Sequence, residues 1–215
     1  LFKAIGYPNV MIKVPATEEG FIAMEALLSE GINVNATLIF SDAQTKGCLE
    51  AFAKANETLI QKGTKKLPQA VISIFVSRFD RKLDEQLKKV DFVTSRVGIM
   101  NAMRCYELIQ NAHLPNVRAL FASTGVKGDE LSPDYYIKEL LLENAINTAP
   151  LGTIKVFIAS SKECKSIELR SDWIENFFHS LAANGIHMQV VCDELVDEGL
   201  SAFKEAFVEI LNELK

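Results

Sequence analysis

Residues 11–40, MIKVPATEEGFIAMEALLSEGINVNATLIF, contain a β-strand, an α-helix and a second β-strand in immediate succession. Val10–Val14 is short, mostly apolar and rich in β-branched residues, which is typical of a buried strand. Thr17 is suited to cap the helix that follows, and Gly31 is suited to end it in the left-handed conformation. Ile32–Phe40 is the second predicted strand. Strands joined by a helix pair in parallel, so this unit predicts an α/β fold.

The same alternation continues through the first two thirds of the chain. Helices are predicted over Asp42–Lys62 and Val97–Ala112. Three further strands are predicted at Ala70–Val76, Val117–Ala122 and Ala145–Thr148. Strands that are apolar on both faces and separated by helices indicate a parallel sheet covered by helices. Five strands do not close an eight-stranded (β/α)8 barrel, so the spacing allows either an open sheet or an incomplete barrel.

No linker rich in Gly, Ser or Pro divides the chain, so we expect one domain over residues 1–215. Within it, residues 1–150 hold the strands and their helices, and residues 151–215 form a helical segment packed on them. The periodicity of Thr153–Ala159 and His187–Cys192 fits a strand as well as a helix. Two apolar stripes at helical spacing are predicted to face the core. They are Trp173, Phe177 and Leu181, and Leu200, Phe203, Phe207 and Ile210.

Composition excludes several classes of function. The formal net charge of −5 provides no general basic surface for nucleic acid. No apolar run is long enough to cross a bilayer. The cysteines Cys48, Cys105, Cys164 and Cys192 lie far apart and form no CxxC pair, so we expect reduced, packed thiols in a cytoplasmic protein. The histidines have no paired acids at a diagnostic spacing, and we expect no metal and no cofactor.

Polar residues on the first two strands are candidates for a site, because α/β proteins place their sites at the carboxyl ends of strands. Lys13 lies near the end of an apolar strand, where apolar surroundings favour a neutral, nucleophilic amine. Alternatively, its stem packs and its ammonium group reaches solvent. Asn35 and Thr37 alternate along the second strand and would face the same space as Lys13. Alternatively, they lie on a strand face that meets solvent.

The third and fourth strands end in residues suited to binding phosphate. Ser73 lies on the third strand, and Arg78 follows its end with a guanidinium group that fits a phosphate. Alternatively, Arg78 is a surface residue that pairs with Asp80 or Asp84. The loop of residues 123–128, STGVKG, follows the fourth strand and combines hydroxyl groups, glycines and a lysine. It is either a phosphate cradle or an ordinary polar loop, and it is not a Walker A motif.

Several collinear blocks together resemble the transaldolase family, and they cover nearly the whole chain. The first of them, from Met11 to Thr17, resembles the family's Schiff-base lysine motif. The others are Gly31–Ser41, Ser73–Arg78, Ala122–Lys127, Ile146–Pro150 and Asp193–Gly199.

The resemblance implies a reaction and a role for each candidate residue. Lys13 would form an imine with a ketose phosphate (fructose 6-phosphate or sedoheptulose 7-phosphate). A dihydroxyacetone unit would then pass to an aldose phosphate (erythrose 4-phosphate or glyceraldehyde 3-phosphate) in the pentose phosphate pathway. Thr37 would help to hold a catalytic water. Asn35 and Ser73 would bind hydroxyl groups of the bound unit, and Arg78, Ser123 and Lys127 would bind phosphate. Related transaldolases have an arginine near the serine that Ser123 matches, and this chain has Lys127 instead.

The resemblance also implies a (β/α)8 TIM barrel whose strands four to eight lie in this chain. Strands one to three, with an aspartate and a glutamate used in proton transfer, would belong to an upstream segment. A homodimer is compatible with the family. Two alternatives remain open: a fructose 6-phosphate aldolase that releases free dihydroxyacetone, and a sugar-phosphate-binding protein without activity. The long helical tail and the phosphate-binding set favour transaldolase over the aldolase, and Lys13 in an apolar strand argues against a mere binding protein.

Overall fold

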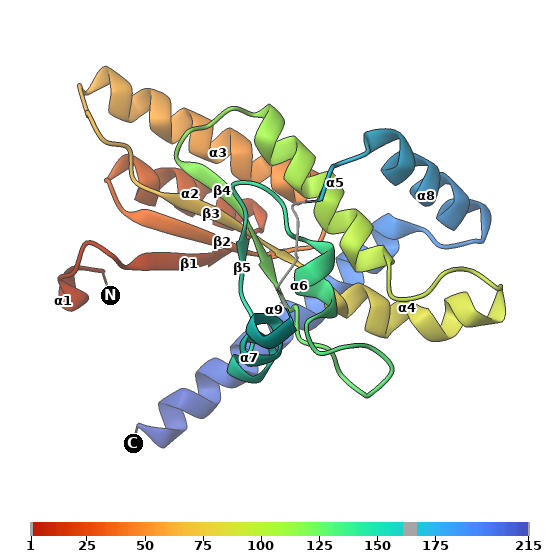
Figure 1. The fold of residues 1–215 in the computed structure, drawn as a ribbon. Helices are drawn as coiled ribbons and strands as arrows, with labels where there is room; N and C mark the ends of the chain where they lie inside the picture. Colours follow the sequence, from red (N-terminus) through yellow and green to blue (C-terminus); the bar gives the residue numbers. More distant parts are fainter. Residues whose placement is uncertain (1, 161–166, 215) are drawn as a thin grey trace.

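A single parallel sheet forms the centre of the molecule in the computed structural model, which describes residues 2–160 and 167–214. The five strands follow one another across the sheet in sequence order (Figure 1). They are β1 (Met11–Pro15), β2 (Asn33–Ile39), β3 (Ala70–Phe75), β4 (Val117–Ala122) and β5 (Ile146–Asn147). Every predicted strand is confirmed to within one residue at each end, and the α/β class with it.

Helices occupy the connections and the tail. They are α1 (Phe2–Ile5), α2 (Glu18–Ser29), α3 (Asp42–Gln61), α4 (Ser77–Lys89), α5 (Val97–Asn111), α6 (Tyr135–Glu139), α7 (Leu151–Ser160), α8 (Ser171–Ala183) and α9 (Met188–Glu213). The two segments of ambiguous periodicity are both helical, in α7 and at the start of α9. None of the helices in residues 2–160 and 167–214 is long and apolar enough to span a membrane.

The first βαβ unit forms for the reasons that its sequence indicates. The hydroxyl of Thr17 accepts a hydrogen bond from the backbone N–H of Gly20 at 3.1 Å and caps α2. A Cβ atom at Gly20 would lie 1.9 Å from the carbonyl oxygen of Pro15, so only glycine permits this tight turn. Gly31 has a φ of +82° and ends the helix in the left-handed region. The chain can therefore turn sharply at both ends of α2.

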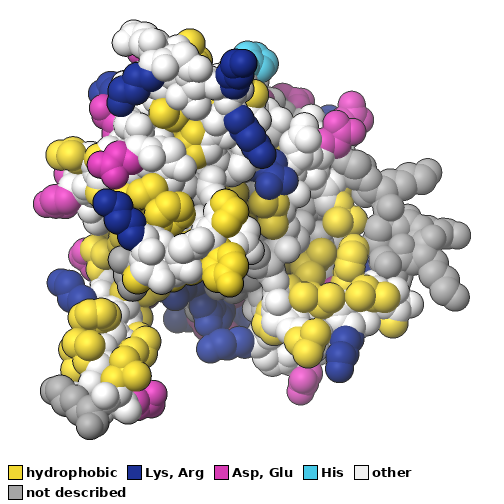
Figure 2. All heavy atoms as spheres, turned by 90° about the vertical axis from the view of Figure 1, so that its left-hand side faces the viewer, with side chains coloured by type: hydrophobic (Ala, Val, Ile, Leu, Met, Phe, Trp, Pro, Cys, Tyr) yellow, Lys and Arg dark blue, Asp and Glu magenta, His cyan; other side chains and the backbone are white. Residues whose placement is uncertain are grey.

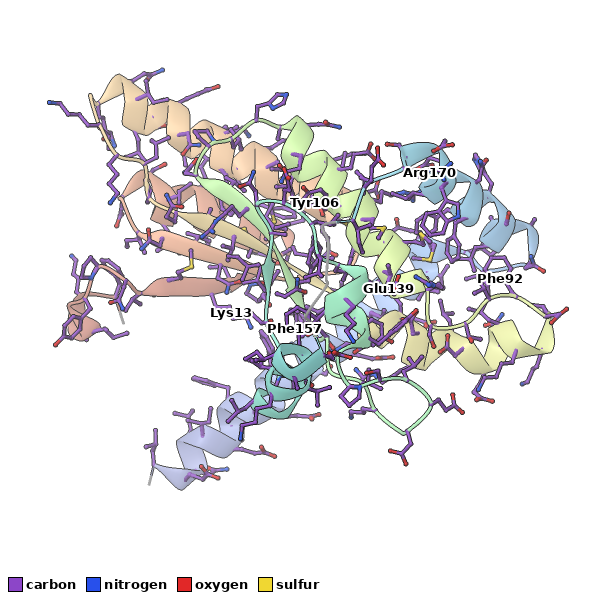
Figure 3. All side chains as sticks on the ribbon, viewed as in Figure 1. Lys13, Phe92, Tyr106, Glu139, Phe157 and Arg170 are labelled. Atoms are coloured by element: carbon purple, nitrogen blue, oxygen red, sulfur yellow. The ribbon has the colours of Figure 1, made fainter. Side chains whose placement is uncertain are left out.

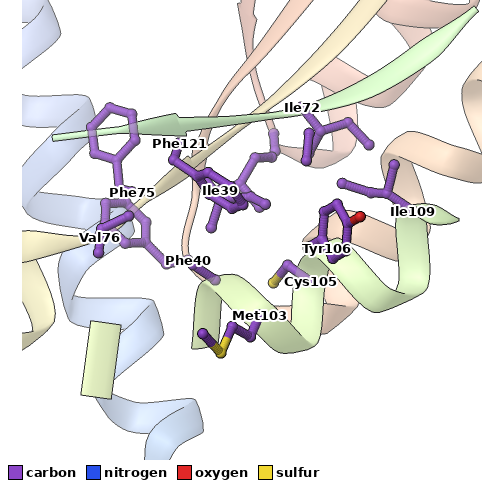
Figure 4. Packing of buried hydrophobic residues seen from close by; sticks show 14 of the residues in the cluster. Ile39, Phe40, Ile72, Phe75, Val76, Met103, Cys105, Tyr106, Ile109 and Phe121 are labelled. Atoms are coloured by element: carbon purple, nitrogen blue, oxygen red, sulfur yellow. The ribbon is translucent and has the colours of Figure 1, made fainter. Parts of the chain in front are cut away.

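One face of the sheet, here called the outer face, is covered by α2, α3 and α5 (Figure 1). Its side chains are apolar and buried, because alternate residues of each strand point to it. They include Val34, Ala36, Ile72, Ile74, Ala119 and Phe121. Figure 4 shows strand residues of this core facing Cys105, Tyr106 and Ile109 of α5. The opposite face, here called the inner face, carries Lys13, Asn35, Thr37 and Ser73.

Helix α8 packs on α5 through a face slightly different from the predicted one. Phe177 and Leu181 are buried as expected, and Ile174 joins them. Trp173, however, is 46% exposed, so that part of the prediction is wrong. The face that packs follows the spacing 174, 177, 178 and 181, which leaves Trp173 on its outer margin.

Helix α9 is buried in its first half and exposed in its second. Val191, Cys192 and Leu195 belong to the hydrophobic core. The predicted core stripe further along does not reach it, since Phe207 is 62% exposed and Ile210 is 53% exposed. Figure 2 shows hydrophobic side chains along the end of this helix, which protrudes from the molecule. Among the described residues, no element covers this end.

The thiols of Cys48, Cys105 and Cys192 are free and buried. Burial raises the pKa of Cys105 and of Cys192 to about 12, so both thiols stay protonated at neutral pH. They act as packed apolar groups, as the sequence predicts. Cys164 lies outside the described residues.

Candidate active site

Lys13, Asn35 and Thr37 come together on the inner face because β1 and β2 pair in parallel. Lys13 lies opposite Asn35 in the register, and Pro15 lies opposite Thr37. Figure 3 shows Lys13 on the side of the sheet where α7 and α9 lie, away from α2 and α3. Lys13 is exposed, Asn35 is half-buried and Thr37 is fully buried. The amine is therefore accessible, and the polar groups beside it are increasingly buried toward the strand ends.

Ser73 of β3 connects the third strand to this group. Its hydroxyl donates a hydrogen bond of 2.7 Å to Oδ1 of Asn35. Ser73 is 2% exposed, so the bond forms where water does not compete strongly. It fixes the rotation of the Asn35 carboxamide beside Lys13.

The end of β2 has an irregular backbone next to Thr37. The hydroxyl oxygen of Thr37 is buried and has no hydrogen-bond partner within residues 2–160 and 167–214. The next residue, Leu38, has a φ of 58°, which is strained for a side chain of its size, and the register with β3 shifts between Ala36 and Ile39. A strained backbone and an unpaired buried hydroxyl both reduce stability, and they are common at functional sites.

Gln44 of α3 holds the irregular strand end in place. Its amide nitrogen donates to the carbonyl oxygens of Leu38 and Ala16, each at 2.9 Å, and its amide oxygen accepts from the N–H of Phe40 at 2.9 Å. Gln44 is not among the site residues predicted from the sequence. Its signal was present: Ser41 and Gln44 have the spacing of a capping box, and Ser41 does cap α3.

Arg78 lies in the first turn of α4, just past the end of β3. Its guanidinium group lies over the ring of Phe75 at 5.0 Å from the centroid. Burial lowers the pKa of Arg78, as does the positive charge of Arg81, while Glu198 opposes both effects. A cleft of about 460 Å³ is lined by Arg78, Arg81, Lys82, Leu195 and Glu198. The half-buried guanidinium group therefore opens onto a cleft that contains two further cations.

The alternative that Arg78 pairs with Asp80 or Asp84 is wrong, because both carboxylates are bound elsewhere. Asp80 accepts from the N–H of Gly98 at 3.0 Å and from the hydroxyl of Tyr136 at 2.9 Å. Asp84 accepts from the backbone N–H of Ser95 at 2.8 Å and from its hydroxyl at 3.0 Å.

Asp80 is also the most perturbed carboxyl group near the site. It is 1% exposed, and burial raises its pKa to about 6, although its bonds to Gly98 and Tyr136 act in the opposite direction. No sequence pattern marks this residue as buried. Its burial comes from α5 and α6, which lie far away in the sequence and supply Gly98 and Tyr136.

Ser123 lies next to the start of α4, and the structure brings it close to Arg78. Its carbonyl oxygen accepts from the N–H of Ser77 at 3.0 Å, and the two hydroxyl oxygens lie 3.1 Å apart. Ser123 has a φ of 56°, a second strained position at a strand end. Lys127 is exposed in the following loop, and no bond joins it to the other candidates in the described chain.

Comparison with known proteins gives one consistent result. A sequence model of the transaldolase/fructose-6-phosphate aldolase family matches residues 1–214. The chain belongs to this family. A transaldolase of Campylobacter jejuni (strain RM1221) is 45% identical over 100% of this chain, and one of Helicobacter pylori (strain Shi470) is 40% identical over 99% of it. The chain spans about two thirds of the length of these relatives, 66% and 63% respectively.

The topology of the sheet is consistent with membership of the transaldolase/fructose-6-phosphate aldolase family. Its strands are parallel and in sequence order, as in a barrel, and the family model covers all five of them. Within the described residues, the structure thus brings Lys13, Asn35, Thr37 and Ser73 together in one group. Arg78 and Ser123 form a second group at the ends of β3 and β4.

Proposed function

We propose that the protein is a transaldolase that transfers a dihydroxyacetone unit between sugar phosphates through a Schiff base on Lys13. The observation that carries this proposal is the placement of Lys13 opposite Asn35, whose carboxamide is bound by Ser73 at 2.7 Å. An accessible amine flanked by fixed hydrogen-bonding groups suits attack on a carbonyl carbon. The names of the relatives support the same reaction.

In this proposal the amine of Lys13 adds to the ketose carbonyl, and water leaves to give a protonated imine. Cleavage of the bond between C3 and C4, with loss of the C4 hydroxyl proton to a base, releases an aldose phosphate, and the electron pair of that bond forms the double bond between C2 and C3 of an enamine. The enamine carbon then attacks the carbonyl of an acceptor aldose phosphate, and hydrolysis of the new imine frees Lys13. Thr37 holds the water of these steps, and Asn35 and Ser73 bind the hydroxyl groups of the three-carbon unit.

Phosphate recognition is assigned to the second group of residues. The guanidinium group of Arg78 supplies charge-assisted hydrogen bonds, and Ser123 supplies a hydroxyl group at the neighbouring strand end. Lys127 adds a positive charge from the loop after β4. Donor and acceptor both carry phosphate, so one anion site serves both halves of the reaction.

We propose further that β1 to β5 are strands four to eight of a (β/α)8 barrel. Their consecutive parallel order supports this assignment, as does the greater length of the relatives. Strands one to three would come from an additional segment and would pair with the free edges of β1 and β5. In such a barrel the inner face is the interior, and the acid–base groups of the reaction would face Lys13 from those strands. A structure of the complete protein in which β1 stays at an edge would contradict this assignment.

Borohydride reduction tests the central proposal. With fructose 6-phosphate present, we expect irreversible labelling at Lys13, located by mass spectrometry of the peptide that contains it. Lys46→Met is a matched control, because Lys46 is an exposed lysine of α3, on the helix-covered side of the sheet. This variant should label like the parent, and Lys13→Met should not label. Absence of labelling in the parent protein would favour a binding protein without activity.

Product analysis separates transaldolase from aldolase. A transaldolase needs an acceptor such as erythrose 4-phosphate for turnover, whereas an aldolase releases free dihydroxyacetone without one. We expect turnover to depend on the acceptor.

A further inference from the structure

Helix α9 crosses the carboxyl ends of the strands and is fixed there by contacts of three kinds. The thiol of Cys192 donates to the carbonyl oxygen of Phe40 at 3.0 Å. The ammonium group of Lys82 forms ion pairs of 2.8 Å with both Glu194 and Glu198 and so ties α9 to α4. A Cβ atom at Gly199 would lie 2.7 Å from Cδ2 of Leu38, so the two segments are as close as a glycine allows.

This anchoring brings α9 to both groups of candidate residues. The same Cβ position at Gly199 is 3.5 Å from Nη1 of Arg78. One turn further along, the ring of Phe203 faces Lys13, and the distance from Nζ to the ring centroid is 5.7 Å. Phe203 is 37% exposed, much less than Phe207 at 62%. The exposed second half of α9 thus includes, near its start, a residue that has a specific contact with the candidate nucleophile.

An aromatic ring in this position has a defined effect on charge. The face of the ring is electron-rich and attracts a cation within about 6 Å of its centroid. The nitrogen of Lys13 carries a positive charge in the protonated imine, which forms when the amine, the carbonyl compound and one proton combine and release one water. A ring that lies against Nζ therefore attracts this nitrogen in each of its cationic states and holds it in one position on the inner face.

We propose that Phe203 is a positioning residue for Lys13, holding its nitrogen against the aromatic face on the inner side of the sheet. The inference rests on the proposed Schiff-base function and adds to it a residue that lies beyond the family block Asp193–Gly199 in the same helix. An aliphatic side chain at residue 203 would occupy similar space but would lack the attraction for a cation. The proposal therefore predicts that the aromatic character of this side chain matters more than its size.

The test uses the complete protein and measures the fraction labelled by borohydride at one subsaturating concentration of fructose 6-phosphate. In Phe203→Leu the labelled fraction should fall about two- to fivefold, the range that corresponds to a cation–π contact at an exposed site. Phe203→Tyr keeps the aromatic face and should label within about twofold of the parent protein. Phe207→Leu is the matched control from the next turn and should label like the parent.

Each outcome bears on the proposal. Labelling of Phe203→Leu at the parent level would overturn it, and so would an equal loss in Phe203→Leu and Phe203→Tyr, which would indicate a purely steric role. If Phe203→Leu does not fold, Phe203→Met provides the same comparison with a flexible apolar side chain. A parent protein that is not labelled at all would overturn the Schiff-base function, and the inference with it. Normal labelling of the parent and of Phe203→Leu would overturn the inference alone.

Discussion

The two faces of the sheet carry different kinds of side chain on the same strands. On the outer face, Ile72 and Phe121 are fully buried beneath helices, and the neighbouring side chains are apolar as well. On the inner face, β1 to β3 present an amine, a carboxamide and hydroxyl groups, of which Lys13 is exposed. Neighbouring residues of one strand thus belong to different environments, because successive side chains point to opposite faces.

Because of this difference, the residues of each strand that stabilise the fold are not the residues that are available for a reaction. The outer face excludes water and holds the helices on the sheet, so its side chains contribute to the free energy of unfolding. The inner face carries polar groups. In a parallel sheet covered by helices on both faces these groups would be buried, which costs free energy. Substitutions on the outer face should therefore reduce stability, and substitutions on the inner face should reduce activity. Lys13→Met, Phe121→Ala and Thr37→Val test this division, and substitutions of Asp80 and Arg78 test charged groups of the neighbouring helix α4.

Lys13→Met should have the largest effect, a complete loss of transfer. The imine requires a primary amine, and methionine keeps the unbranched stem without supplying one. Because Lys13 is exposed, the free energy of unfolding should change by no more than about 0.5 kcal/mol. Coupled assays of transfer and urea unfolding would measure both quantities. Substantial turnover in this variant would refute the Schiff-base assignment.

Phe121→Ala should destabilise the protein most. Phe121 is fully buried on the outer face, and its ring centroid lies 6.4 Å from that of Tyr106. Removing a buried phenylalanine side chain costs about 3–5 kcal/mol, because apolar contacts are lost and a cavity remains. Activity per folded molecule, measured well below the melting temperature, should stay unchanged. A large loss of activity at full folding would show that the two faces are not independent.

Asp80→Asn should change how stability depends on pH. The pKa of Asp80 is raised from 3.8 to about 6 in the folded protein, so the folded state binds a proton more tightly than the unfolded state. The stabilisation from this proton is present below about pH 4 and is lost as the pH rises through 6. A shift of this size corresponds to about 3 kcal/mol at most.

Asparagine stays neutral, so Asp80→Asn should gain stability relative to the parent protein between pH 4 and pH 7. Chemical denaturation of both proteins at the two pH values gives this difference directly. Asp80→Ala is a useful comparison, since it leaves Gly98 N–H and the Tyr136 hydroxyl without their acceptor and should be less stable at both pH values. An unchanged difference between Asp80→Asn and the parent protein at the two pH values would mean that Asp80 titrates normally.

Arg78→Ala should weaken the binding of phosphorylated sugars specifically. A charge-assisted hydrogen bond contributes about 1.5–3 kcal/mol, so KM for fructose 6-phosphate should rise about ten- to a hundredfold. For free dihydroxyacetone as donor, KM should change little. Steady-state kinetics with both donors provides the comparison, and equal losses would show that Arg78 does not recognise phosphate.

Much of the fold could be predicted from the sequence, because the strands and the first helices are specified locally. The cap at Thr17 and the left-handed residue at Gly31 form as their residue types indicate. The tail was harder to predict, since the periodicity of α7 does not distinguish a helix from a strand. Trp173 has the right spacing for burial and is exposed, because the helix turns Ile174 toward α5 instead.

The candidate site was predictable where motifs follow strands and was missed where distant helices contribute. Lys13, Asn35 and Ser73 lie on neighbouring strands, so their proximity follows from parallel pairing. Phe203 reaches the site from α9, and its contact depends on how that helix packs. Gln44 lies in the first turn of α3, and the local spacing from Ser41 could have marked it. No spacing along the chain encodes a distance such as that between Phe203 and Lys13.

Thr37→Val should have the smallest effect and tests the boundary between the two faces. Thr37 belongs to the inner face, yet it is fully buried, and its hydroxyl has no partner in the described part of the chain. Valine has nearly the same shape and brings no polar atom into this space. Burying an unpaired hydroxyl reduces stability, so the variant should be as stable as the parent or more stable by up to about 1 kcal/mol.

If Thr37 holds the catalytic water, kcat should nevertheless fall about two- to tenfold, which corresponds to one neutral hydrogen bond. Thr37→Ser is the matched control, because it keeps the hydroxyl and should retain most of the activity while losing some stability. Thermal melts and kcat measured on the same three samples decide the question. A less stable Thr37→Val protein with full activity would mean that the hydroxyl stabilises the fold. The residues of β2 that serve activity would then lie N-terminal to Thr37.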